Sequence, residues 1–255
     1  MGRYSSQEPY ILGAAGMLAF FAAWQALNSF GIVEEFFISS PWHVWQKTIE
    51  MLGEGMIISD VLVSGREFLV GFGLAMAFGI PLGFLMGWYR YVEWSLDPYV
   101  WFLYSAPLIA FYPLFIYWLG MGTPTVITIS FLLSVFPILV NTMTGVQNVD
   151  GSLIKAARSF GANDYEIFRK ISLPASLPIV VAGLRLGVGR AMVGVIVGEF
   201  FGANAGLGYR IAYFGGRMQT TEMFVFLVLV GILGVLLTQI LRACEGRFAN
   251  WRTSS

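Results

Sequence analysis

The stretch FLVGFGLAMAFGIPLGFLMGW, residues 68–88, decides the class of this chain, because it runs for 21 residues without a charged side chain. A helix rises about 1.5 Å per residue, so about 20 apolar residues cross the roughly 30 Å hydrocarbon core of a bilayer. Residues 68–88 therefore predict a transmembrane helix.

Five further segments have the same apolar character, although the fifth of the six carries two arginines. They are residues 10–30, 98–119, 125–146, 175–198 and 223–241. Hydrophobic residues make up 57% of the 255-residue chain, and all fifteen acidic residues lie outside these six segments. We therefore expect an all-α integral membrane protein in which residues 1–255 form a single transmembrane domain with six spanning helices.

The positive charges near the segment ends predict the orientation. With the N-terminus inside, nine lysines and arginines fall on the cytoplasmic side and four on the outer side. The nine are Arg3, Arg90, Lys155, Arg158, Arg169, Lys170, Arg242, Arg247 and Arg252, and the four are Lys47, Arg66, Arg210 and Arg217. This bias predicts a multi-pass protein of the inner or plasma membrane with both termini in the cytoplasm. Segment 10–30 is longer than a signal-peptide core and lacks a small-residue cleavage site, so we expect a retained anchor.

Several kinds of site are excluded by residue counts. The chain has one cysteine, Cys244, and one histidine, His43, which argues against an internal disulfide and a Cys/His metal site. None of its three lysines follows a glycine, so the phosphate-binding loop G-x-x-x-x-G-K-[ST] is absent. We expect no cofactor, no metal, no ATP site of that kind and no enzymatic activity in this chain.

Small residues recur at helical spacing in two of the spans. Gly71, Ala75, Gly79, Gly83 and Gly87 follow one another every four residues. The segment 175–198 repeats the pattern with Gly183, Gly187 and Ala191, and again with Gly194, Gly198 and Gly202. Such stripes let another helix approach closely, and we take them as one reason to expect two copies to pair. Ordinary packing within one chain is the alternative.

A charged insert, GSLIKAARSFGANDYEIFRKISLPASLP, interrupts the apolar sequence at residues 151–178. Its first part predicts a short helix that ends at Gly161, a typical C-terminal stop. Asn163 and Glu166 then form the pattern of a capping box, which starts a second short helix, and Pro174 and Pro178 are expected to end it. Leu153 and Phe160 have no core of their own to enter, so a small apolar patch rimmed by charge predicts a docking surface. A solvated loop between spans is the alternative.

Within this insert, KAARSFGANDYEIFRKISLP resembles the EAA signature of ABC importer permeases, in which E-A-A, three residues, Gly, nine residues and I-x-L-P lie in a cytoplasmic loop. The matching positions are Ala156, Ala157, Gly161, Ile171, Leu173 and Pro174, and Lys155 stands where the pattern has Glu. Three flanking stretches resemble the nitrate/sulfonate/taurine branch of these permeases: residues 64–87, 113–122 (PLFIYWLGMG) and 197–211 (VGEFFGANAGLGYRI).

The resemblance implies a type I importer fold and a set of partners. These are a second copy of the chain, a cytoplasmic ABC ATPase dimer that binds ATP, and an extracytoplasmic substrate-binding protein; no nucleic acid is expected. The residues implied in coupling to the ATPase lie in the cytoplasmic loop 150–174. They are Leu153, Lys155, Ala156, Ala157, Arg158, Phe160, Gly161, Ile171, Leu173 and Pro174.

Arg185 and Arg190 are the costliest residues of the spans, because a central arginine is penalised by roughly 2.5–3.5 kcal/mol on insertion scales. They lie five residues apart, about 140° around a helix, so one straight helix cannot point both into a narrow pore. We expect one of them to face the translocation pathway, with Glu199 as a further candidate there, and the cargo to be a small anionic or zwitterionic solute. The alternative is structural: Arg190 snorkels outward and Arg185 bonds backbone carbonyls.

Rival functions remain open. The permease could belong to another ABC import branch. A self-sufficient channel or ion-coupled carrier is disfavoured because such carriers place Asp, Glu or His inside the membrane, where we expect none. A membrane scaffold without cargo would explain the insert but give the two arginines no function.

Overall fold

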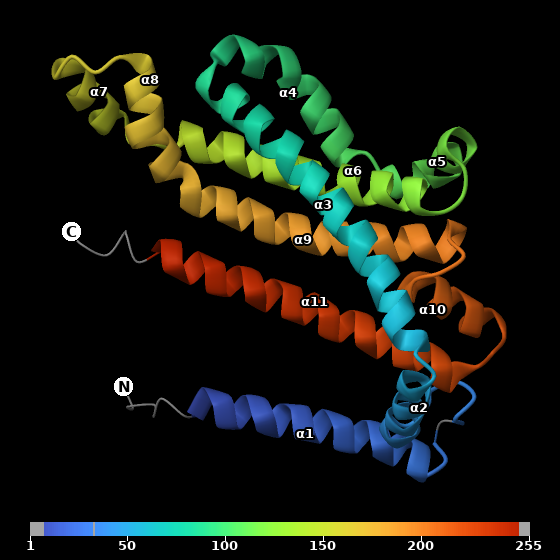
Figure 1. Ribbon diagram of the computed structural model, residues 1–255. Coiled ribbons are helices and arrows are strands. Elements are labelled where there is room, and N and C mark those ends of the chain that lie inside the picture. Colours follow the sequence, from blue (N-terminus) through green and yellow to red (C-terminus); the bar gives the residue numbers. More distant parts are fainter. Residues whose placement is uncertain (1–7, 33, 250–255) are drawn as a thin grey trace.

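The computed structural model describes residues 8–32 and 34–249, and this part of the chain is built from helices without β-strands. Figure 1 shows them in chain order. The elements are α1 (Glu8–Ser29), α2 (Pro41–Gly53), α3 (Met56–Trp88), α4 (Arg90–Ser105), the 3-10 helix η1 (Leu108–Phe111), α5 (Tyr112–Leu119), α6 (Thr123–Gln147), α7 (Gly151–Ser159), α8 (Asp164–Ile167), the π-helical turn η2 (Phe168–Ser172), α9 (Leu173–Gly202), α10 (Leu207–Gly216) and α11 (Thr220–Ala249).

Among the described residues, five helical stretches are long and apolar enough to cross a membrane, and a sixth crossing results if the bent pair α4 and η1–α5 counts as one. The five are Ile11–Ser29, Met56–Trp88, Thr123–Gln147, Asp164–Gly202 and Thr220–Ile240. The all-α membrane fold expected from the sequence is confirmed at this level.

The expected span 98–119 is not one straight helix. Residues Arg90–Ser105 and Leu108–Leu119 are bent by 81° at the break between them. Ala106 adopts an extended conformation there, with φ −67° and ψ 140°. Pro107 follows, and proline disfavours the helical conformation of the residue before it. The break therefore has a local cause in the sequence.

Helix α3 begins at Met56, twelve residues before the expected start at Phe68. The added turns contain Asp60 and Glu67, which are 2% and 1% exposed. Two acidic residues outside the expected spans therefore lie buried within a helix that is long enough to cross a membrane. The predicted span starts directly after Glu67, because hydrophobicity alone counts a carboxylate as the end of a span. Sequence does not show which partners compensate a buried charge.

Helix α6 is the centre of the bundle and packs along both α3 and α9. The glycine stripes make these contacts possible. A Cβ on Gly83 would lie 2.6 Å from the carbonyl oxygen of Leu139, and one on Gly194 would lie 2.7 Å from the Cα of Ser130, both on α6. The stripes thus serve packing within one chain, which is the alternative given above. They do not support the pairing of two copies.

The insert continues into the next span instead of ending before it. Residues Asp164–Gly202 form one helical stretch of 39 residues, so the expectation that Pro174 and Pro178 end the second short helix is wrong. The π-helical turn η2 lies directly before Pro174, which occupies the first turn of α9. A wider turn and a first-turn position both tolerate the missing N–H of proline.

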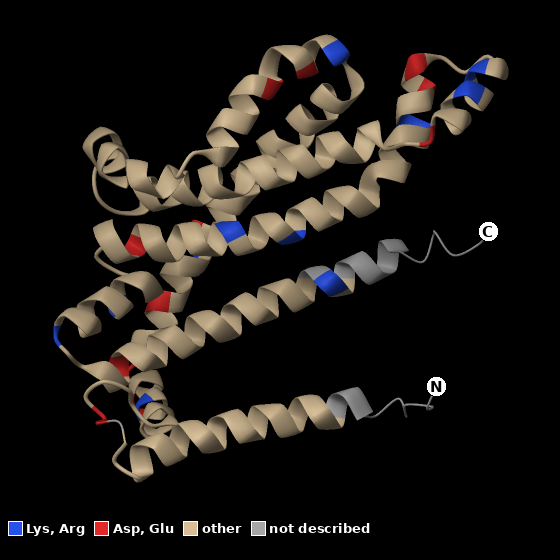
Figure 2. Ribbon diagram, turned by 180° about the vertical axis from the view of Figure 1, so that it is seen from behind, with Lys and Arg blue, Asp and Glu red and all other residues tan. Residues whose placement is uncertain are grey.

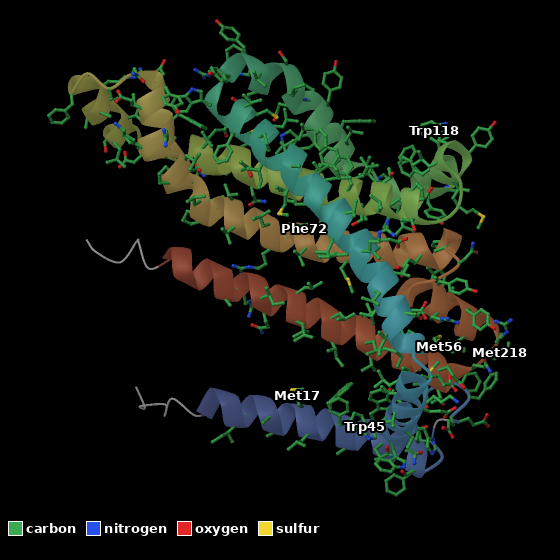
Figure 3. The ribbon with its side chains drawn as sticks, viewed as in Figure 1. Met17, Trp45, Met56, Phe72, Trp118 and Met218 are labelled. Atoms are coloured by element: carbon green, nitrogen blue, oxygen red, sulfur yellow. The ribbon has the colours of Figure 1, made fainter. Side chains whose placement is uncertain are left out.

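The two ends of the bundle differ. Helices α7 and α8 project at the end where α1 begins and α11 finishes, while α2, α5 and α10 lie at the opposite end (Figure 1). Figure 2 marks both basic and acidic positions at the projecting end, on α7 and on the helical stretch that follows it. At the other end, Trp45 and Trp118 are 59% and 64% exposed and lie apart from Phe72 in the packed middle of α3 (Figure 3).

Candidate functional site

Helix α7 starts and ends with capping contacts that its own sequence supplies. The Asp150 carboxylate accepts a 2.8 Å hydrogen bond from the backbone N–H of Ser152, which lowers the pKa of Asp150. At the other end, Gly161 has a φ of +82°. Its N–H donates to Arg158 at 3.0 Å and the Ala162 N–H donates to Ala157 at 3.1 Å, the two bonds of a Schellman motif.

The next helix begins with the expected capping box. The Glu166 N–H donates to the Asn163 side chain at 2.9 Å, and the Asn163 N–H donates to the Glu166 carboxylate at 3.1 Å. Arg158 also pairs with Asp164 at 3.1 Å, across the turn. We call residues 150–166 the α7 corner, and its shape is fixed by contacts within the corner.

The α7 corner exposes its apolar side chains. Phe160 is 92% exposed and Leu153 is 51% exposed, and no residue of α7 is buried. Lys155, Ala156 and Arg158 are also exposed, whereas Ala157 is half-buried. The other three residues of the expected coupling set, Ile171, Leu173 and Pro174, are half-buried where the insert joins α9. The corner is therefore a formed surface with an apolar side chain at its tip.

Arg190 is exposed on α9 and lines a hollow of about 240 Å³. The other walls come from the end of α4, the break before η1 and the middle of α6: Tyr104, Ala106, Pro107, Leu108, Ile109, Leu132, Leu133 and Phe136. The hollow thus brings the interrupted helix and a membrane arginine together.

The other two candidate pathway residues lie elsewhere. Arg185 is half-buried, and its Nε atom is enclosed by protein. Glu199 is fully buried and does not line the hollow: its Oε1 accepts a 2.5 Å hydrogen bond from Ser64, and its Oε2 accepts a 2.7 Å bond from the Gly208 N–H. Of the three, Arg190 is the one that lines this hollow.

Glu199 belongs to a buried polar cluster that the sequence analysis missed. The Asp60 carboxylate accepts from the Gly206 N–H at 2.9 Å and pairs with Arg210 at 2.6 Å. Ser64 accepts from the Leu207 N–H at 2.9 Å. Side chains of α3 and α9 thus bind the three backbone N–H groups that open α10, and the φ of +108° at Gly206 lets the loop turn into them.

A signal for this cluster is present in the sequence. Asp60, Ser64 and Glu67 are spaced four and three residues apart, which places them on one face of α3. The polar face precedes the apolar run 68–88, where charge favours a loop. The helical periodicity of these three residues upstream of that run is the signal that indicates the cluster.

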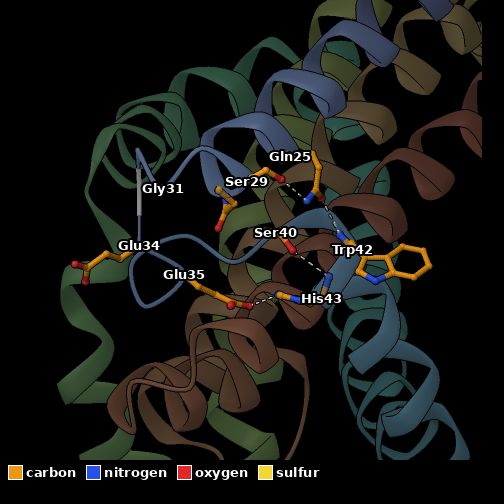
Figure 4. A pocket seen from close by; sticks show the side chains of 9 residues that line it. Gln25, Ser29, Gly31, Glu34, Glu35, Ser40, Trp42 and His43 are labelled. Carbon is orange, nitrogen blue, oxygen red and sulfur yellow. Dashed lines mark hydrogen bonds and ion pairs between the residues drawn. The ribbon is translucent and has the colours of Figure 1, made fainter.

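A second hollow, of about 500 Å³, lies where α1 meets α2 (Figure 4). Its lining includes Glu34, and His43 contacts Glu35 across it. The Ser40 side chain caps α2 by accepting a 3.2 Å bond from the His43 N–H. None of the candidate pathway residues lines this hollow, and its hydrogen bonds tie the end of α1 to α2.

Comparison with known proteins agrees with this arrangement. Residues 79–247 match the family described as binding-protein-dependent transport system inner membrane component. A probable ABC transporter permease protein of Brucella abortus (strain 2308) is 37% identical over 229 residues, which cover 90% of each chain. A putative aliphatic sulfonates transport permease protein of Bacillus subtilis (strain 168) is 30% identical over 233 residues, covering 91% of this chain and 84% of the relative.

A solved structure of the methionine ABC transporter MetNI, in an inward-facing conformation, is similar in fold. Its TM-score is 0.66 at 21% sequence identity, and the match covers 79% of this chain and 98% of that chain. The helical arrangement described above is thus shared with a chain of that transporter.

Proposed function

We propose a cargo and a mechanism for this chain, which belongs to the family of binding-protein-dependent transport system inner membrane components, the permease subunits of ABC importers. Two copies pair in the membrane and form a pathway for a small anionic or zwitterionic solute. The sulfonate-type cargo is suggested by the Bacillus subtilis relative, whose name states aliphatic sulfonates. A binding protein delivers the solute, and a cytoplasmic ATPase dimer supplies the energy.

The observation that carries the proposal is the hollow at Arg190. An arginine at this depth is costly against lipid, by roughly 2.5–3.5 kcal/mol. Arg190 is exposed in the single chain, and a second copy or a water-filled pathway beside it supplies the polar surroundings that lipid lacks. Because a cation attracts an anion more strongly where water is scarce, a pathway lined by Arg190 favours negatively charged groups of the cargo.

The α7 corner provides the contact with the ATPase. Its exposed Phe160 and Leu153 are suited to enter an apolar groove, and the exposed Lys155 and Arg158 surround them. Since the corner is stiffened by its own caps, a displacement of α7 is transmitted through α8 and η2 to α9, which carries Arg190. This continuous helical path links the energy source to the pathway.

The two functions that differ most from this proposal are an ion-coupled carrier and a scaffold without cargo. Buried acids do occur in the bundle, so the sequence-based reason against an ion-coupled carrier no longer holds. Family membership takes its place, because it assigns the chain to binding-protein-dependent systems. A scaffold without cargo would leave the arginine-lined hollow without a role.

Substitution of Arg190 tests the cargo. Uptake is measured in cells that also express the ATPase and the binding protein. We expect Arg190→Ala to abolish most uptake, and Arg190→Lys to restore part of it, because lysine keeps the charge but lacks the planar fork that matches oxyanions. The half-buried Arg185 serves as the comparison, and Arg185→Lys should transport better than Arg190→Lys. Normal uptake by Arg190→Ala, with the protein inserted at normal levels, would refute the anionic pathway.

A further inference from the structure

The third span breaks next to Arg190, at the level of the middle of α6. Helix α4 ends at Ser105, the chain bends by 81°, and Pro107 and Leu108 line the same hollow as Arg190. Backbone that leaves the helix at membrane depth is tolerated only where it is buried in protein or lines a water-filled cavity. This break borders a hollow of about 240 Å³, so the groups that it leaves free are available to a small solute.

The bend leaves backbone carbonyls at the end of α4 without their helical donors. The donor for the Leu103 carbonyl would be the N–H of residue 107, which is a proline and has none. The donor for the Tyr104 carbonyl would be the Leu108 N–H, which donates to the Ala106 carbonyl instead, at 2.8 Å. Helical carbonyls point toward the C-terminal end of their helix and carry a partial negative charge there. The end of α4 is therefore a negative pole at the edge of the hollow.

Arg190 supplies the positive pole of the same hollow. Its guanidinium makes no hydrogen bond or ion pair within the described part of the chain, so it does not bond the carbonyls at the end of α4 itself. None of the described residues that line the hollow is acidic. The Tyr104 side chain lines the hollow as well, and its ring packs against that of Trp101 with centroids 5.8 Å apart. Aromatic rings attract ammonium groups, so this ring adds to the attraction for a cation near the end of α4.

We propose that the hollow is a binding site for a small zwitterion, in which Arg190 binds the anionic group and the free carbonyls of Leu103 and Tyr104 bind an ammonium group. The site rests on the proposed pathway and narrows its cargo to solutes that carry both charges. A plain anion would pair with Arg190 but leave the carbonyls to water, and a plain amine would be repelled by the unmatched arginine. A zwitterion makes charge-assisted hydrogen bonds at both poles.

Binding of small probes to the purified full-length chain in lipid nanodiscs tests the site. The binding protein is left out because it has a specificity of its own. The probes are 3-aminopropanesulfonate, propanesulfonate and propylamine, which share one carbon chain and differ in their charged ends. Measured by titration calorimetry, 3-aminopropanesulfonate should bind about tenfold more tightly than either singly charged probe, the factor that one charge-assisted hydrogen bond provides.

Substitution of Pro107 tests the negative pole. Pro107→Ala restores the missing N–H, so the Leu103 carbonyl regains a donor and the advantage of 3-aminopropanesulfonate over propanesulfonate should disappear. Pro98→Ala is the matched control, because Pro98 lies inside α4, where the helix continues, and this variant should keep the preference. Arg190→Ala should weaken the binding of both sulfonates.

The outcomes separate this site from the proposed transport function. Equal affinity for 3-aminopropanesulfonate and propanesulfonate, a preference that survives in Pro107→Ala, or no binding of 3-aminopropanesulfonate would each overturn the zwitterion site. The comparison of probes uses the wild-type chain, so it decides the matter even if Pro107→Ala does not fold. Uptake of propanesulfonate by the whole transporter would still support ATP-driven import of anions while the zwitterion site fails.

Discussion

At the scale of single residues, Gly161 has a conformation that other residues adopt poorly. Its φ of +82° lies in the left-handed region, and a Cβ built on it would meet nothing within 4 Å. The obstacle to a larger residue is therefore backbone strain, not crowding. Gly151, at the start of α7, also has open space around it but is not among the positive-φ glycines. A matched pair of glycines thus flanks α7, with Gly151 at its first position and Gly161 just after its end.

This pair provides a residue-scale prediction. Gly161→Val should distort the α7 corner and uncouple ATP hydrolysis from uptake, whereas Gly151→Val should transport nearly normally. Gly161→Asn should retain part of the coupling, because asparagine tolerates the left-handed conformation. The ratio of solute imported to ATP hydrolysed is measured in vesicles containing the whole transporter. Equal ratios for the two valine variants would show that the corner is not required for coupling.

At the scale of elements, α9 has a packed face and an open face. Glycines on the packed face contact α6, as at Gly194. The open face carries Leu186, Arg190 and Val193, spaced four and three residues apart and all exposed in the single chain, with Leu186 at 56% and Val193 at 47%. This spacing defines one continuous stripe, which the proposed pairing of two copies would cover.

Cysteine cross-linking tests the open face of α9. In a Cys244→Ser background, Leu186→Cys should form a cross-link between two copies in native membranes. Val188→Cys lies at nearly the same depth on the packed face, where Val188 is 4% exposed, and should not cross-link. If neither cysteine cross-links under oxidising conditions or with short bifunctional reagents, the open face is not near the partner's α9.

The sequence predicts elements better than it predicts their contacts. The six apolar regions and the capping signals at Gly161 and Asn163 are local, and the corner follows directly from them. The proline at 107 does explain the break in the third span, but proline also occurs at 174 and 178, where the chain stays helical. Pro174 follows the π-helical turn η2 at the start of α9, and Pro178 lies inside α9, so a proline alone does not show where a helix ends.

The polar cluster was missed for a different reason. Asp60 and Glu67 were assigned to a loop because charge disfavours a membrane helix, and the compensating groups come from residues 199–210, more than a hundred positions away. The glycine stripes fitted both pairing of copies and packing within one chain, because sequence shows that a helix can be approached closely but not which helix approaches it. Tertiary contacts of this kind are fixed by the fold as a whole.

At the scale of the whole molecule, the two sites to which we assign energy input and solute recognition lie in different parts of the bundle. The α7 corner projects at one end, the hollow at Arg190 lies along α9, and the polar cluster holds α10 at the other end. Family membership assigns the chain to transport systems with a separate binding protein. A single chain of this kind is expected to be inactive by itself.

Uptake into reconstituted vesicles tests the central claim most directly. Vesicles containing the chain together with its ATPase, ATP and binding protein should accumulate a small sulfonate, and Arg190→Ala should prevent this accumulation. Vesicles with the chain alone should accumulate none, with or without an ion gradient. Accumulation by the chain alone, driven by an ion gradient and unaffected by ATP, would contradict the assignment to an ATP-driven importer.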